Sequence, residues 1–325
     1  MRKWTCVFLA LFLVGSLSSM ALAQQKQIKL KAVQFVNMGN PSEKPFHYFV
    51  DSVNKQAKGE LSIEIVGGPD SIAGTDQPEA VRSGAVDLAF VPCGWYQSVL
   101  PVASVMGLSR VTPMEGRKTR LHDFLVEEHK KVGLRFIGAN DFSGPFYMYA
   151  KKPIAHPDEL KGLRFRHSPT YTFFKGIGLT PITAAHSDVY TGLERNLFDG
   201  LATKPGTFVE LCLYEVCKFV IGPGFWPDYS TVTIMNEAKF GQLPKHLQGL
   251  MMGAMEKGEP AMKALCAPDI EQQWKTMKEK GMKHIEWSPE VSKKFLDHID
   301  ALTWEIRVKK LPEGMAEKLK KMMGY

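Results

Sequence analysis

The sequence lacks the motifs on which most enzyme classes depend. It contains no G-x-S-x-G nucleophile elbow, no H-E-x-x-H zinc motif, no C-x-x-C pair and no glycine-rich phosphate loop. Gly176 and Gly178 form only a glycine pair, which is typical of the end of a helix. We therefore expect no catalytic residue, no metal site and no cofactor, and a protein that is not an enzyme.

Long apolar runs are also missing after the first residues of the chain. Met1-Arg2-Lys3 is basic, residues 4–17 are apolar, and Ala21-Leu22-Ala23 has the small-x-small pattern of a signal-peptide cleavage site. The apolar run is too short for a stable membrane span. We expect a signal peptide at residues 1–23, cleaved after Ala23, and a soluble, exported mature protein.

Cysteine content and net charge are both low. Cleavage would leave four cysteines, with 39 basic and 34 acidic residues and a net charge of +5. This charge mildly favours anionic ligands, but it is too small and too dispersed to indicate nucleic acid as a partner. Cys212 and Cys217 are expected on one helix, at a spacing that directs their side chains apart. We therefore expect no disulfide framework, although an exported protein could form one.

The first half of the chain alternates strands and helices. Apolar patterns predict strands at residues 28–35, 61–66 and 88–91, with helices at 46–57 and 77–82. This alternation is typical of a mostly parallel α/β sheet, in which ligands bind beyond the carboxyl ends of the strands.

The loops that follow these strands are candidate ligand contacts. They contain Asn37, after the first strand, and the adjacent pair Trp95 and Tyr96, after the third. We expect one of the two aromatic rings to face the ligand; the alternative is that both are core residues.

The segment from residue 157 to residue 200 has the most informative pattern. Leu163-Arg164-Phe165-Arg166 alternates as a strand, with its two arginines on one face. Residues 171–177 carry a helical stripe, residues 180–183 form a second strand, and Ser187-Asp188 can cap a further helix. The unit ends in the turn Asp199-Gly200.

This unit resembles the substrate-binding subunits of tripartite ATP-independent periplasmic (TRAP) transporters, of the DctP-like family. The matching motifs, in the family's order, are Leu160-Lys161-Gly162-Leu163-Arg164-Phe165-Arg166, Ser187-Asp188-Val189-Tyr190-Thr191-Gly192-Leu193-Glu194 and Asp199-Gly200. The resemblance implies the two-lobed α/β clamshell of periplasmic binding proteins, with a mostly parallel sheet flanked by helices in each lobe and a long helix spanning both. It also implies a periplasmic location and, as partners, a small and a large integral membrane subunit.

By the same resemblance, Arg166 binds the carboxylate of the ligand. A guanidinium is planar and always charged, and its donors fit a carboxylate with two parallel hydrogen bonds. The alternative interpretation is a solvated basic cluster of Arg166 with Lys161 and Arg164. The motif favours the carboxylate clamp.

Three positions depart from the family pattern. Phe146 stands six residues before Lys152-Pro153-Ile154, where the family often has a second arginine. His186 replaces an aromatic residue that often covers the ligand; it could contact the ligand, or only cap the following helix. Further on, Thr203 or Lys204 could replace a ligand-binding asparagine.

The later part of the chain is expected to pass the ligand-binding cleft again on its way back to the first lobe. We predict a helix at residues 211–220, followed by a rigid loop that contains Phe225 and Trp226. Two helices are then expected within residues 245–280, separated after residue 257 and with a bend near Pro268.

Length and resemblance together predict the domain organisation. Residues 24–143 with about 230–262 are expected to form lobe I, and residues 144–229 with about 263–305 to form lobe II. Residues 306–325 are amphipathic and are expected to form a C-terminal helix that packs on the body.

The ligand expected from these residues is an organic acid. Phe146, in place of a second arginine, argues against a compact dicarboxylate, and it could form an apolar, partly aromatic box with Trp95, His186, Phe225 and Trp226. We expect a monocarboxylate with an apolar or aromatic body, bound by the arginine clamp and by closure of the lobes. The alternatives are a small hydroxy or keto acid, a dicarboxylate, or a periplasmic sensor that presents its ligand to a receptor.

Overall fold

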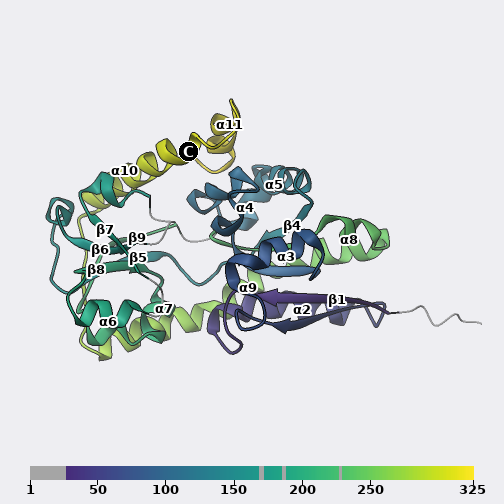
Figure 1. The fold of residues 1–325 in the computed structure, drawn as a ribbon, viewed down its shortest axis with the longest axis horizontal. Helices are drawn as coiled ribbons and strands as arrows, with labels where there is room; N and C mark the ends of the chain where they lie inside the picture. The colour runs from purple at the N-terminus through teal and green to yellow at the C-terminus, as the bar shows by residue number, and fades with distance from the viewer. Residues whose placement is uncertain (1–26, 168–171, 185–187, 227–228) are drawn as a thin grey trace, which may run out of the picture.

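The computed structural model describes residues 27–167, 172–184, 188–226 and 229–325. The predicted signal peptide, Ser187 and His186 lie outside these residues. Within them the chain forms two lobes, each built on its own sheet and flanked by helices (Figure 1). No helix in this part of the chain is long and apolar enough to cross a membrane.

The sheet of lobe I has the strand order β2-β1-β3-β10-β4 in the described part of the chain. Its strands are β1 (Ile28–Gln34), β2 (Leu61–Gly67), β3 (Leu88–Pro92), β4 (Leu134–Ala139) and β10 (Thr231–Asn236). Only β10 runs opposite to the others in this sheet, antiparallel to both of its neighbours. The helices of this lobe are α2 (Lys44–Gln56), α3 (Gln77–Ser83), α4 (Pro113–Lys118), α5 (Leu121–Lys130) and α8 (Glu237–Gln242).

The sheet of lobe II has the order β11-β9-β5-β8-β6-β7 among the described strands. These are β5 (Phe146–Ala150), β6 (Arg164–His167), β7 (Thr180–Thr183), β8 (Gly200–Thr203), β9 (Phe219–Phe225) and β11 (Lys283–Ile285). Here β5 alone is reversed relative to the rest of the described sheet. Helices α6 (Val189–Glu194) and α7 (Pro205–Glu210) follow β7 and β8. Each lobe therefore has the mostly parallel sheet that the sequence predicts.

The reversed strands follow from the way in which the chain crosses between the lobes. Residues 140–145 connect β4 to β5, and residues 226–230 connect β9 to β10. Because these crossings are short, each strand that receives one must begin near the edge where its neighbours end. The carboxyl edges of the two sheets consequently face each other, and this is the position where α/β proteins bind ligands.

Helix α9 (Lys245–Glu279) is continuous through Pro260 and Pro268, so the prediction of two helices separated after residue 257 was wrong. It buries Met255 in the core of lobe I and Met277 in the core of lobe II. Packing on both lobes outweighs the backbone hydrogen bonds that the two prolines remove. The long helix that the family resemblance implies is present.

The predicted helix at residues 211–220 is also absent from the structure. A 3-10 helix at Leu213–Glu215 is followed, after residues 216–218, by β9, which includes most of the predicted rigid loop. The short apolar run of β9 pairs with β5, and such runs fit a buried strand as well as a helix. Cys212 has a positive φ of 52° before the 3-10 helix, so Cys212 and Cys217 do not share a helix; both thiols are free.

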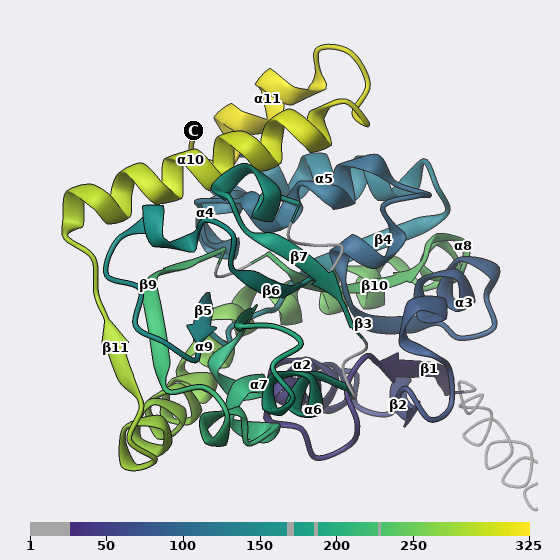
Figure 2. The same cartoon turned by 60° about the vertical axis from the view of Figure 1, so that its left-hand side comes forward.

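The last two helices lie along the outside of both lobes. Figures 1 and 2 show α10 (Pro289–Val308) and α11 (Met315–Met322) on the same side of the molecule as α4 and α5. One buried cluster continues from lobe I and lobe II into these helices through Trp226, Ile299 and Leu319. The C-terminal residues are thus part of the packed body.

Candidate functional site

The facing edge of lobe II carries four of the residues that the sequence singled out. Arg166 lies in β6, Phe146 is the first residue of β5, Thr203 is the last residue of β8, and Phe225 is the last residue of β9. Antiparallel pairing places Phe146 opposite Phe225, and Thr203 pairs with Tyr147. Strand pairing thus brings these residues to one end of the sheet.

Arg166 is held at this edge by its strand. Phe165, its neighbour on the opposite face, is fully buried, as the alternation predicts, whereas Arg166 is partly buried. The Nε of Arg166 donates a 3.2 Å hydrogen bond to the carbonyl oxygen of Ala184, just beyond β7. This contact orients the guanidinium near the carboxyl ends of β6 and β7.

Arg164 has a different role from Arg166. Its Nη2 lies 2.9 Å from the Oδ1 of Asp199, and its backbone N–H donates to Oδ2 of the same carboxylate at 2.9 Å. Asp199 immediately precedes β8, so this ion pair lies at the amino end of the strands, away from the facing edge. The hydrogen bond from Arg164 and its charge hold the pKa of the Asp199 carboxyl below its ordinary value.

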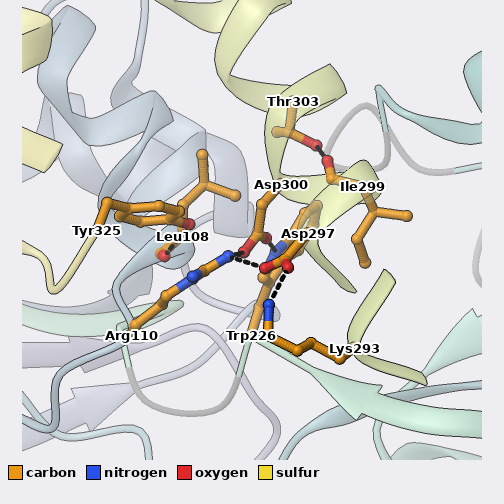
Figure 3. Close-up of polar contacts among 9 residues, drawn as sticks. All are labelled: Leu108, Arg110, Trp226, Lys293, Asp297, Ile299, Asp300, Thr303 and Tyr325. Atoms are coloured by element: carbon orange, nitrogen blue, oxygen red, sulfur yellow. Dashed lines mark hydrogen bonds and ion pairs between the residues drawn. The ribbon is translucent and has the colours of Figure 1, made fainter. Parts of the chain in front are cut away.

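Phe146 is the partly exposed member of an aromatic cluster. Its ring centre lies 6.0 Å from that of Phe225, which in turn lies 5.7 Å from Phe173 and 5.3 Å from Trp226. Phe225 and Trp226 are buried, and the Trp226 Nε1 donates a 3.0 Å hydrogen bond to Asp300 of α10 (Figure 3). The structure therefore places Trp226 in the packing between the lobes and α10.

Lys204, the residue after β8, is paired with a carboxylate that the sequence analysis missed. Its Nζ lies 2.5 Å from the Oδ1 of Asp141 and 5.1 Å from the centre of the Phe146 ring. Burial alone would raise the pKa of Asp141, but the charge of Lys204 and hydrogen bonds from Lys204, Ser230 and Thr231 outweigh burial and lower that pKa below its ordinary value. The only sequence signal for Asp141 is that it is an acidic residue close to the predicted boundary between the lobes, at residues 143 and 144.

Lobe I contributes an exposed indole to its facing edge. Trp95 is 37% exposed, in the 3-10 helix Cys93–Tyr96 after β3, and its ring meets Phe35 edge-on at 5.9 Å. The indole lies over Gly74, where a Cβ atom would come within 2.6 Å of the ring. A side chain at residue 74 would thus displace Trp95.

Tyr96 is a core residue. It is 2% exposed, and its hydroxyl lies 2.8 Å from the Nε2 of His129. The Nδ1 of His129 lies 2.6 Å from the carbonyl oxygen of Leu125 and must donate to it, so Nε2 accepts the hydroxyl proton of Tyr96. Of the adjacent aromatic pair, only Trp95 is available to a ligand.

The loop after β1 reaches lobe II. Asn37 is exposed there, and Asn40, three residues on, donates from its side chain to the Glu210 carboxylate of α7 at 2.9 Å. Two cavities of about 580 and 490 Å³ lie elsewhere, beside the end of α9 and between α10 and α11. Neither cavity is lined by a strand end of the facing edges, so we place the candidate site at those edges.

Two lobes joined by two short crossings and one long helix, with an arginine and aromatic rings on their facing edges, define the class of two-lobed solute-binding proteins. The chain belongs to the bacterial extracellular solute-binding proteins of family 7, DctP, whose family model matches residues 32–310. This is the TRAP family that the sequence motifs indicated, and its members are transport proteins and not enzymes.

Individual relatives cover nearly the whole chain. It is 29% identical to the 2,3-diketo-L-gulonate-binding periplasmic protein YiaO of Escherichia coli, over 96% of each chain. The fold is similar to that of DctP7, a Bordetella pertussis solute receptor binding pyroglutamic acid, with a TM-score of 0.76 and 19% identity over 91% of this chain and 99% of that one. It is also similar to a TRAP solute-binding protein from Desulfovibrio salexigens with bound orotic acid, with a TM-score of 0.78 and 16% identity over 91% and 97% of the chains.

Proposed function

We propose that this protein captures a monocarboxylate with an apolar or aromatic body in the periplasm and delivers it to the two membrane subunits of a TRAP transporter. The observation that carries the proposal is the position of Arg166 at the carboxyl edge of β6, where the two sheets face each other. In this proposal the guanidinium binds the carboxylate, and the exposed indole of Trp95 packs on the body of the ligand from lobe I. Asn37, Thr203 and His186 are proposed as further contacts.

Capture requires that the ligand binds the closed form better than the open form. An arginine–carboxylate pair supplies this difference, because its attraction strengthens as the closing lobes exclude water. In the proposed movement, residues 24–143 with about 230–262 rotate against residues 144–229 with about 263–305. Crossings 140–145 and 226–230 are the hinges.

The charge at the facing edge favours a monocarboxylate. Phe146 has no charge, and the charge of Lys204 is compensated by Asp141. Among the described residues of this edge, Lys204 is therefore already paired and does not offer its charge to a second ligand carboxylate. The pyroglutamic and orotic acids bound by two similar proteins are both ring compounds with one carboxylate. The name of the Escherichia coli relative favours a second candidate, a polar keto acid of sugar-acid type.

A thermal-shift screen on the mature protein tests the ligand class. The screen compares pyroglutamate, orotate and phenylpyruvate with 2,3-diketo-L-gulonate and succinate. A ligand at a hundred times its dissociation constant should add about 2.7 kcal/mol to the free energy of unfolding. Stabilisation by succinate alone would show that the aromatic-box proposal is wrong, and stabilisation by diketogulonate alone would support the second candidate.

A further inference from the structure

One buried carboxylate joins both crossings to the facing edge of lobe II. Asp141 lies in the first crossing and is 3% exposed. Its Oδ1 accepts hydrogen bonds from the Ser143 hydroxyl at 2.7 Å and from the Lys204 ammonium at 2.5 Å, and its Oδ2 accepts from the Ser230 hydroxyl at 2.5 Å.

These partners belong to three segments of the chain. Ser143 follows Asp141 in the first crossing, Ser230 lies at the end of the second crossing, and Lys204 is the N-cap residue of α7, directly after β8. Lys204 also reaches the Ser143 hydroxyl at 3.0 Å, so the ammonium contacts the first crossing twice.

Separating Lys204 from Asp141 costs free energy, whereas moving the two residues together does not. The Lys204 side chain is 13% exposed and that of Asp141 is 3% exposed, so separating the two charges would leave each in a poorly solvated environment. A rotation of the lobes must therefore either carry Asp141, Ser230 and Lys204 together or exchange their contacts. Either way, the geometry at the end of β8 depends on the geometry of both crossings.

We propose that Asp141 is a positioning residue for lobe closure, which couples both crossings to the end of β8 at the facing edge through Lys204 and Ser230. The inference rests on the proposed function, because it presupposes that the lobes rotate about these crossings. Asp141 itself needs no contact with the ligand: it acts by fixing where Lys204 and the Phe146 ring beside it lie when the lobes move.

The test compares Asp141→Asn with Asp199→Asn in the mature, ligand-free protein. Asp199 is the matched control, because it flanks the other end of β8 and pairs with Arg164 of the same lobe, away from both crossings. In Asp141→Asn we expect at least about tenfold faster hydrogen exchange of the amides of residues 140–144 and of residues 226, 229 and 230 together. The radius of gyration from small-angle X-ray scattering should also increase. Asp199→Asn should leave both measurements as in the wild type.

A double variant distinguishes the loss of coupling between the crossings and β8 from a general loss of protein stability. Asp141→Asn with Lys204→Met removes both charges, and it should recover much of the melting temperature lost in Asp141→Asn without slowing exchange in the crossings. Exchange that rises in only one crossing, an equal effect of Asp199→Asn, or full recovery in the double variant would overturn the proposal. None of these measurements uses a ligand. A failed carboxylate screen would therefore count against the proposed function, but it would not change what the hydrogen-exchange and scattering results say about Asp141.

Discussion

The indole nitrogen of Trp226 and the carboxylate of Asp300 form a 3.0 Å hydrogen bond between the second crossing and α10 (Figure 3). The other oxygen of Asp300 accepts from Arg110 of lobe I at 2.8 Å, and the ring of Tyr325 lies 4.2 Å from the Arg110 guanidinium. Asp297 accepts from the same guanidinium at 2.9 Å. The C-terminal helices thus hold the second crossing to lobe I, which gives Trp226 a structural role.

Replacing Trp226 by phenylalanine should change stability and leave ligand affinity almost unaltered. The variant keeps an aromatic ring but loses the hydrogen bond to Asp300. Loss of this hydrogen bond should lower the unfolding free energy, measured by urea titration, by about 1 kcal/mol. Because Asp300 remains paired with Arg110, the buried carboxylate keeps a partner. A loss of affinity above tenfold at normal stability would instead identify Trp226 as a ligand contact.

Replacing Arg166 by alanine should abolish most of the affinity for the carboxylate. Hydrogen bonds to charged groups contribute about 1.5–3 kcal/mol each, so the dissociation constant measured by calorimetry should rise at least about tenfold. Arg166→Lys should recover only part of this, because an ammonium cannot form the two parallel bonds of a guanidinium.

The neighbouring Arg164→Ala provides the control for Arg166. Arg164 has the same residue type on the same strand face, but it is 43% exposed and paired with Asp199. Its removal should change affinity less than about threefold and leave the unfolding transition almost unchanged, because exposed ion pairs contribute little to stability. Equal losses of affinity in both variants would show that the strand, and not the Arg166 guanidinium, is what binding requires.

Burial of His129 should make the protein less stable in acid. Burial lowers the pKa of His129 to about 4, so this residue is neutral in the folded protein, whereas its unfolded pKa is about 6.5. Protonation then favours the unfolded chain, and stability is lost as the pH falls from about 6.5 towards 4. At pH 5 the loss from this group should be about 2 kcal/mol.

Urea unfolding of His129→Gln at pH 7.5, 6 and 5 measures this contribution. The variant should be less stable than the wild type at pH 7.5, because Tyr96 loses its acceptor, but its stability should fall less between pH 7.5 and 5. An unchanged slope in His129→Gln would contradict the assignment.

Replacing Pro268 by alanine should stabilise the protein. Pro268 lies exposed within α9, and proline in a helix interior is about 3 kcal/mol less favourable than alanine. We expect a gain of about 1–3 kcal/mol in unfolding free energy, measured with urea. Pro289→Ala is the matched control: Pro289 is the first residue of α10, where proline is favourable, so that change should bring no gain.

Local patterns predicted β1, β2, β3, β6 and β7, and the family motifs predicted the class of fold. Apolar patterns gave β1, β2 and β3 to within a residue or two, and alternation correctly separated buried Phe165 from Arg166. These features depend on nearest neighbours in the sequence, which is why sequence reasoning reached them. The two-lobed arrangement came from the motifs and not from periodicity.

The local sequence patterns could not predict features that depend on tertiary packing. Continuity of α9 through its prolines requires two lobes to pack on it. Most of β9 was predicted as a rigid loop, because Gly222-Pro223-Gly224 is typical of a turn and only the pairing with β5 identifies the strand. Whether Trp95 or Tyr96 is exposed depends on His129, which lies far along the chain. The pairing of Asp141 has no local sequence signal, since its partners come from three separate segments.

The place of β10 in lobe I has a consequence for the order in which the protein can fold. This strand lies between β3 and β4 in the sheet, although the whole sheet of lobe II except β11 precedes it in the chain. A chain that has emerged only as far as residue 230 therefore has a gap in the middle of its first sheet, with β3 and β4 each exposing an unpaired edge. Lobe II, by contrast, can pair five of its strands before β10 exists, and it should be the first part of the molecule to become protected.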